Sequence, residues 1–275
     1  MSEVSETPWL RESKLILENV SRSYSSSNGT LTALENINLA VKEGEFLCIV
    51  GPSGCGKSTL LNLMAGLDRP TSGTIWADGH PMEVPHKGHI LIFQELGLFP
   101  WLTVRENVEF GLRMQGIGEK ERRNRARDYL RMVHLSRFEN SYIHQLSGGM
   151  KQRVALARAF ALEPDVLLMD EPFAALDAQT RDLLHEELER IWIETHKTIF
   201  FVTHNVREAV RLGDRVILLT FRPGRLKSGF FVDLPRPRHL EDPALIKTAR
   251  EVLEQLRGEI NKAVEAEYNR DEESI

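Results

Sequence analysis

Short apolar runs alternate along this chain with longer segments of helical periodicity. Runs of four or five apolar residues, each bounded by polar or helical sequence, are typical of buried parallel strands. These runs cover residues 46–50, 90–93, 166–169, 199–202 and 216–219. The alternation predicts an α/β fold in which helices cover a mainly parallel sheet.

Three segments depart from this alternation. Residues 15–20 and 34–39 flank a turn signal at 25–29, which predicts antiparallel strands at an edge of the fold. Residues 104–146 are helical in pattern and strongly charged, which predicts a small helical subdomain. Near the end, Asp242 is a good N-cap before Pro243, and apolar residues recur at helical spacing, so we expect one further helix.

Composition narrows the class of protein. The 275 residues are 41% hydrophobic and 27% charged, as in soluble globular proteins, and the net charge of −5 argues against a general nucleic-acid coat. The two cysteines, Cys48 and Cys55, fall in a predicted strand and a loop, so we expect no disulfide framework and a reducing compartment. Neither a secretory signal nor an apolar run long enough to span a bilayer is expected.

The strongest chemical signal is a complete phosphate-binding loop pattern between a predicted strand and a predicted helix. Its glycines let backbone N–H groups turn inward around an anion, Lys57 would reach the β- and γ-phosphates, and the Ser58 hydroxyl would ligate Mg²⁺. A plain glycine-rich turn is the alternative. The expected nucleotide-binding residues are Gly51, Pro52, Ser53, Gly54, Cys55, Gly56, Lys57, Ser58 and Thr59.

A second glycine-rich segment lies about ninety residues further along. Ser147, Gly148 and Gly149 precede the apolar helical segment 154–160, and the N-terminus of a helix attracts anions. The chain therefore has two helix ends suited to phosphate but one lysine-bearing loop. A nucleotide shared between two copies of the chain would explain that count.

An acidic pair follows the apolar run 166–169. Nucleotides bind at the carboxyl ends of strands in open α/β sheets, so we expect Asp170 to support Mg²⁺ and Glu171 to orient and deprotonate the attacking water. A helix-capping acidic pair is the alternative.

Residues 146–153 resemble the signature motif of ABC transporter ATP-binding subunits, and the resemblance runs from about residue 15 to residue 238. It implies a P-loop NTPase core with an N-terminal antiparallel β subdomain and a helical subdomain at about 96–160. It also implies a head-to-tail dimer in which each ATP lies between one phosphate loop and the partner's signature. The predicted domains are residues 13–238 and a C-terminal helical extension, 239–275.

The resemblance assigns further roles one residue at a time. Tyr24 would stack on adenine, with a tyrosine packed in an edge strand as the alternative. Gln94 would sense Mg²⁺ and water, Asp177 would cross the dimer interface, and His204 would hydrogen-bond the γ-phosphate. Asn205 replaces the aspartate usual in the family, which leaves the polar contacts across the interface open.

The apolar residues 98–101 allow two interpretations. They could form an exposed groove that receives a helix from a membrane subunit, or Trp101 could belong to the core of the helical subdomain.

Three short stretches, 98–104, 222–225 and 234–238, resemble the branch of the family that serves importers of nitrate, sulfonates, taurine and bicarbonate. This resemblance implies integral membrane permease subunits as partners and, indirectly, an extracytoplasmic solute-binding protein. It places the chain peripherally at the cytoplasmic face of the cell membrane, without a nucleic-acid partner. The alternatives are a soluble ABC-type ATPase acting on nucleic acid or ribosomes, and a phosphotransferase, which would leave residues 146–153 unexplained.

Overall fold

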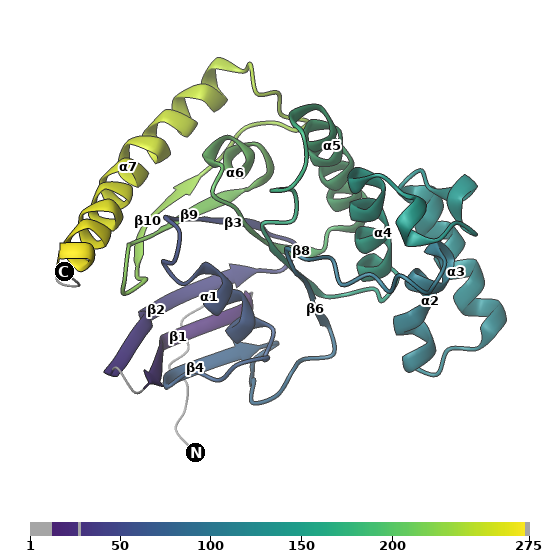
Figure 1. The fold of residues 1–275 in the computed structure, drawn as a ribbon, viewed down its shortest axis with the longest axis horizontal. Helices are drawn as coiled ribbons and strands as arrows, with labels where there is room; N and C mark the ends of the chain where they lie inside the picture. The colour runs from purple at the N-terminus through teal and green to yellow at the C-terminus, as the bar shows by residue number, and fades with distance from the viewer. Residues whose placement is uncertain (1–12, 27–28, 273–275) are drawn as a thin grey trace. The chain divides into compact units, whose positions relative to one another are not determined.

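Two long antiparallel strands, β1 (Ser13–Ser26) and β2 (Gly29–Lys42), open the part of the chain that the computed structural model describes, which is residues 13–26 and 29–272. β1 also pairs with β4 (Ser72–Ala77), as Figure 1 shows, and β4 pairs with β5 (His80–Pro81), which gives the order β2-β1-β4-β5. The predicted antiparallel subdomain is confirmed. Within this sheet β2 is an edge strand, whereas β1 hydrogen-bonds β2 on one side and β4 on the other.

The described residues divide into two compact units, and the first comprises those up to His86 together with those from Thr198 onward. Besides the antiparallel sheet, it contains β3 (Phe46–Val50), β8 (Thr198–Val202), β9 (Arg215–Leu219) and β10 (Leu226–Phe231). β3 lies between β8 and β9 and is parallel to both, while β10 is antiparallel to β9. Every residue of β3 and β8 is buried, as expected for strands covered on both faces.

The helices of this first unit, among the residues that the structure describes, are α1 (Lys57–Met64), α6 (Val206–Leu212) and α7 (Pro243–Glu272). The predicted cap of α7 is confirmed, since Asp242 accepts a hydrogen bond from the Ala244 N–H at 2.8 Å.

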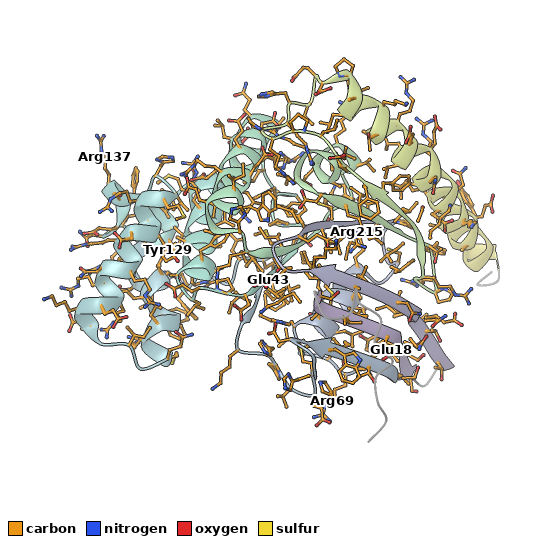
Figure 2. The ribbon with its side chains drawn as sticks, turned by 180° about the vertical axis from the view of Figure 1, so that it is seen from behind. Glu18, Glu43, Arg69, Tyr129, Arg137 and Arg215 are labelled. Atoms are coloured by element: carbon orange, nitrogen blue, oxygen red, sulfur yellow. The ribbon has the colours of Figure 1, made fainter. Side chains whose placement is uncertain are left out.

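Arg215 of β9, labelled in Figure 2, links the two sheets. Its guanidinium binds Glu45 at 2.8 Å and the Ala40 carbonyl of β2 at 2.6 Å.

The second unit, Lys87–Lys197, combines a short parallel pair of strands with helices. Its strands are β6 (His89–Ile92) and β7 (Val166–Asp170). Its helices are α2 (Val104–Met114), α3 (Glu119–Met132), the 3-10 turns Ser136–Phe138 and Ile143–Gln145, α4 (Gly148–Phe160) and α5 (Ala178–Thr195). The predicted α/β class, with parallel strands and a helical segment, is confirmed.

Within the described ranges, no helix combines the length and the apolar character that crossing a bilayer requires.

Candidate nucleotide site

The phosphate loop lies in the first unit, between the buried strand β3 and helix α1. Lys57 opens α1 and is only 7% exposed, and its Nζ donates to the carbonyls of Gly51 and Pro52 at 3.0 and 3.1 Å. Gly56 caps the helix at φ +101°, and a Cβ on it would lie 2.7 Å from Leu34 Cδ2. Only glycine suits both the conformation and the space. The sequence therefore places a lysine and a glycine-dependent backbone turn together at one helix end.

Among the other side chains of this loop, the two serines are exposed and the cysteine is buried. Ser53 and Ser58 are exposed, so the Ser58 hydroxyl in the first turn of α1 is accessible to a ligand. Cys55 is buried, and burial raises the pKa of its thiol although Lys57 opposes the rise. A thiol that stays protonated is a poor nucleophile, so Cys55 fits a packing role rather than covalent chemistry.

His204 follows β8, the strand parallel to β3, at the edge of the sheet from which the phosphate loop starts. Thr203 is buried; it hydrogen-bonds Glu208 and accepts from the Asn205 N–H at 3.0 Å. This turn leaves the His204 side chain exposed. Asn205 caps α6 by accepting from the Arg207 N–H at 3.0 Å. Asparagine and aspartate cap helices about equally well, so Asn205 can replace the aspartate usual in the family without loss of the α6 cap.

Tyr24 lies in the part of β1 that pairs only with β2, beyond the last β4 partner at Ser21. Its hydroxyl donates to Asp68 at 2.9 Å, and the Arg22 guanidinium lies 4.5 Å from the ring centroid. One face of the ring is therefore already engaged in a cation–π contact. Stacking on adenine stays a prediction, and it requires the other face or displacement of Arg22.

The acidic pair belongs to the second unit, at the carboxyl end of β7. Val166 to Met169 are buried, whereas Asp170 and Glu171 are half-buried. Glu171 has φ +44°, an unfavourable conformation for a side-chain-bearing residue that is often found at functional sites. Gln94 is exposed two residues after β6, which pairs in parallel with β7 up to Ile92 opposite Met169. Gln94 and the acidic pair therefore leave neighbouring strands at the same edge.

The signature segment opens α4 as predicted. Ser147 is the N-cap and accepts from the Met150 N–H at 3.3 Å. A serine hydroxyl that accepts at its oxygen can still donate its hydrogen to an anion. Gly149 has a packing reason as well, because a Cβ there would lie 2.5 Å from Thr180 Cγ2 on α5. Asp177 caps α5 through the Thr180 N–H, a hydrogen bond that lowers the pKa of its carboxyl.

The sequence reading missed Arg158, which it treated as one more position in an apolar helical segment. The Arg158 guanidinium donates to the carbonyls of Leu96 and Gly97 at 2.5 and 2.7 Å. It thereby links the signature helix to the loop after Gln94. The available signal was a single arginine within the apolar segment 154–160, since such a charge needs partners.

Trp101 is 70% exposed, so its assignment to the core of the helical subdomain is wrong. Phe99 packs between Trp101 and Phe110, with ring centroids 5.5 and 4.4 Å away. Asn107 is fully buried and holds this loop by hydrogen bonds to both backbone groups of Phe99.

Residues 34–174 match the family model described as ABC transporter. The chain belongs to the ABC transporter family. Among the relatives of this ATPase, an uncharacterized ABC transporter ATP-binding protein of Methanocaldococcus jannaschii is 49% identical, covering 91% of this chain and 94% of the relative. The nitrate import ATP-binding protein NrtD of Synechocystis is 46% identical, with 92% and 98% covered. The taurine import ATP-binding protein TauB of Burkholderia pseudomallei is 50% identical, with 81% and 86% covered.

Solved structures agree with the ABC ATPase fold. A dimeric ATP-binding cassette in a post-hydrolysis state with ADP and phosphate bound has a TM-score of 0.71 and 38% identity, covering 80% of this chain and all of the other. The family identifies this chain as an ATP-binding and ATP-hydrolysing subunit.

Proposed function

We propose that this ABC ATPase powers import of a small solute of the nitrate, sulfonate, taurine or bicarbonate type through integral membrane permease subunits. Its domain 13–238 acts at the cytoplasmic face of the membrane, and an extracytoplasmic solute-binding protein is an indirect partner. The relatives named for nitrate import and taurine import support this solute class. Residues 239–275 form an extension of that domain.

One observation carries the proposed mechanism: two helix ends suit phosphate, and only α1 begins at a complete phosphate loop with its lysine, Lys57. In the proposed dimer, the loop before α1 binds the phosphates of ATP, and Ser147, Gly148 and Gly149 of a second copy complete the site. The dimeric cassette with ADP and phosphate bound supports this assembly. Tyr24 contacts the adenine, and Asp177 contributes at the interface between the copies.

The proposed metal ligands are oxygen atoms from Ser58, Gln94 and Asp170. A hydroxyl, an amide and a carboxylate are the hard donors that Mg²⁺ prefers, and all three groups lie on exposed or half-buried residues at helix or strand ends. Bound Mg²⁺ would neutralise charge on the phosphates. His204 donates a hydrogen bond to the γ-phosphate, while Glu171 accepts a proton from the attacking water.

Replacing Glu171 by glutamine tests the general base. The amide cannot accept the proton, so we expect ATP turnover to fall at least about 100-fold while ATP binding persists. The variant should accumulate as a closed dimer, measured by light scattering after gel filtration with ATP.

The matched control is Glu163→Gln, because Glu163 is also an acidic residue with positive φ, +52°, but is exposed and follows α4. That variant should hydrolyse ATP normally. Normal turnover by Glu171→Gln would remove Glu171 from the role of base.

The membrane partner is supported by the exposed apolar surface of the second unit. Trp101, Met114 and Phe93 are large apolar side chains of this unit, and they are 70%, 64% and 50% exposed. Expression of the chain with its neighbouring genes should yield co-purification with an integral membrane subunit. Replacing Trp101 by Ala should weaken that association without reducing ATP binding. Isolation with ribosomes or nucleic acid instead would favour the soluble ATPase.

A further inference from the structure

A loop distant in sequence packs directly on the phosphate loop. Arg222 donates from Nε to the Gly54 carbonyl at 2.8 Å. Gly224 approaches so closely that a Cβ on it would clash with the Cys55 carbonyl. Residues 220–225 therefore contact the backbone of the phosphate loop at two successive carbonyls.

This loop is internally closed and tied to β2. The Thr220 hydroxyl donates to the Pro223 carbonyl at 2.8 Å and accepts from the Arg225 N–H at 2.9 Å. Gly224 exchanges backbone hydrogen bonds with β2, donating to Ala33 at 2.9 Å and accepting from Glu35 at 3.0 Å. The backbone that carries Arg222 is therefore already ordered. Less conformational entropy is then lost when the Arg222 side chain binds the Gly54 carbonyl.

Helix α7 secures the same loop. Glu259 is 1% exposed and accepts from the Phe221 N–H at 2.9 Å, from Lys227 at 2.8 Å and from Lys262 at 2.9 Å. Burial opposes ionisation, but the hydrogen bonds from Lys227, Lys262 and Phe221 outweigh it and lower the pKa of Glu259 to about 2. At neutral pH a buried carboxylate therefore holds the residue that precedes Arg222.

We propose that Arg222 is a positioning residue for the phosphate loop and that α7, through Glu259, holds Arg222 in place. In a trans peptide the carbonyl and the N–H point in opposite directions. When Arg222 binds the Gly54 carbonyl, it therefore fixes the direction of the Cys55 N–H, which donates to the Pro52 carbonyl at 3.3 Å and closes the turn of the phosphate loop. A fixed turn keeps the other backbone N–H groups of the loop in the arrangement that an anion requires, and the guanidinium adds positive charge beside it.

This inference rests on the proposed function, because it assumes that the phosphate loop binds ATP. It assigns the C-terminal extension an effect on nucleotide affinity, with no contact between α7 and the nucleotide.

The test measures binding of a fluorescent ATP analogue with Mg²⁺, and the KM and kcat for ATP, using the full chain. Arg222→Ala should raise Kd and KM about threefold to tenfold, the loss expected for one charge-assisted hydrogen bond, and leave kcat almost unchanged. Arg222→Lys should recover most of the affinity, because an ammonium can also donate to the Gly54 carbonyl.

Arg225→Ala is the matched control. Arg225 lies in the same loop and has the same charge, but its guanidinium binds Glu35 at 2.6 Å instead of the phosphate loop. An exposed ion pair contributes little, so Kd should stay within about twofold of wild type. Equal weakening by Arg222→Ala and Arg225→Ala would overturn the proposal, as would a normal Kd for Arg222→Ala.

Glu259→Ala tests the second step, with Glu251→Ala on the exposed side of α7 as its control. Glu259→Ala should raise Kd, as Arg222→Ala does, whereas Glu251→Ala should leave Kd unchanged. Thermal unfolding without nucleotide shows that each variant is folded. A normal Kd for folded Glu259→Ala would remove α7 from the proposal.

Lys57→Ala separates this inference from the proposed function. If it binds the ATP analogue as tightly as wild type, the phosphate loop is not the nucleotide site and both proposals fail. If it loses binding while Arg222→Ala stays normal, only the role of Arg222 is wrong.

Discussion

The two helix ends proposed to bind one nucleotide are built differently. Neither α1 nor α4 has an acidic residue in its first turn, whereas α2 and α3 do, so both ends keep their positive potential for an anion. At α1, Gly56 caps the helix without a side-chain hydrogen bond, and Lys57 is buried beside the loop. At α4, Ser147 caps the helix in the ordinary way.

This difference would explain why α4 acts together with the phosphate loop of another copy in the proposed dimer. The phosphate loop supplies backbone N–H groups, a lysine and conformational freedom within a few residues. The signature end supplies a capped helix whose Gly149 is already required by packing against Thr180. A single capped helix end attracts an anion by only about 0.3–1 kcal/mol in the exposed case, so α4 contributes best to an ATP that another copy already holds.

The largest effect on ATP hydrolysis is expected from substitutions that disable the α1 end and the α4 end separately. Ser147→Arg should leave ATP binding by a monomer intact and reduce hydrolysis at least about 100-fold, since a bulky cation blocks the shared site. Lys57→Ala should instead lose ATP binding. Binding is measured with the fluorescent analogue and hydrolysis by phosphate release.

Mixing the two inactive variants sharpens this test. Each mixed dimer has one site with an intact phosphate loop and an intact signature, so an equal mixture should regain about one quarter of wild-type hydrolysis. Full hydrolysis by a dilute, strictly monomeric preparation would contradict the shared site.

Much of this arrangement could be predicted from sequence, because the relevant signals are local. The apolar runs predicted β3, β6, β7, β8 and β9, and the glycine spacing predicted the phosphate loop before α1. Asp242 predicted the start of α7. In each case a few neighbouring residues determine the backbone conformation, so the local sequence pattern is enough to predict it.

What the sequence did not reveal depends on contacts between distant segments. Nothing near Arg222 indicates that it hydrogen-bonds Gly54, which is 168 residues away. The glycine at 149 was interpreted as an anion-binding residue, and only the packing of α4 on α5 gives it a second reason. The interior place of β1 likewise follows from its pairing with β4, which local pattern does not encode.

A smaller effect, on stability, should show whether packing requires the glycines at the start of α4. Gly149→Ala places a methyl group against Thr180 and should cost about 1–3 kcal/mol of unfolding free energy, measured by urea denaturation. Gly148→Ala is the matched control, since its Cβ would meet Leu176 Cδ2 at an ordinary 3.4 Å and should be tolerated.

Thr180→Ser removes the methyl group in the way, so the double variant Gly149→Ala, Thr180→Ser should regain stability. Its hydrolysis should also return, because the backbone N–H of residue 149 is retained while the Asp177 cap uses the backbone N–H of residue 180. A double variant that is as stable as wild type but inactive would show that the Cβ itself obstructs the nucleotide. The glycines of α4 would then serve the anion as directly as those of the phosphate loop, and the contrast between the two helix ends would fail.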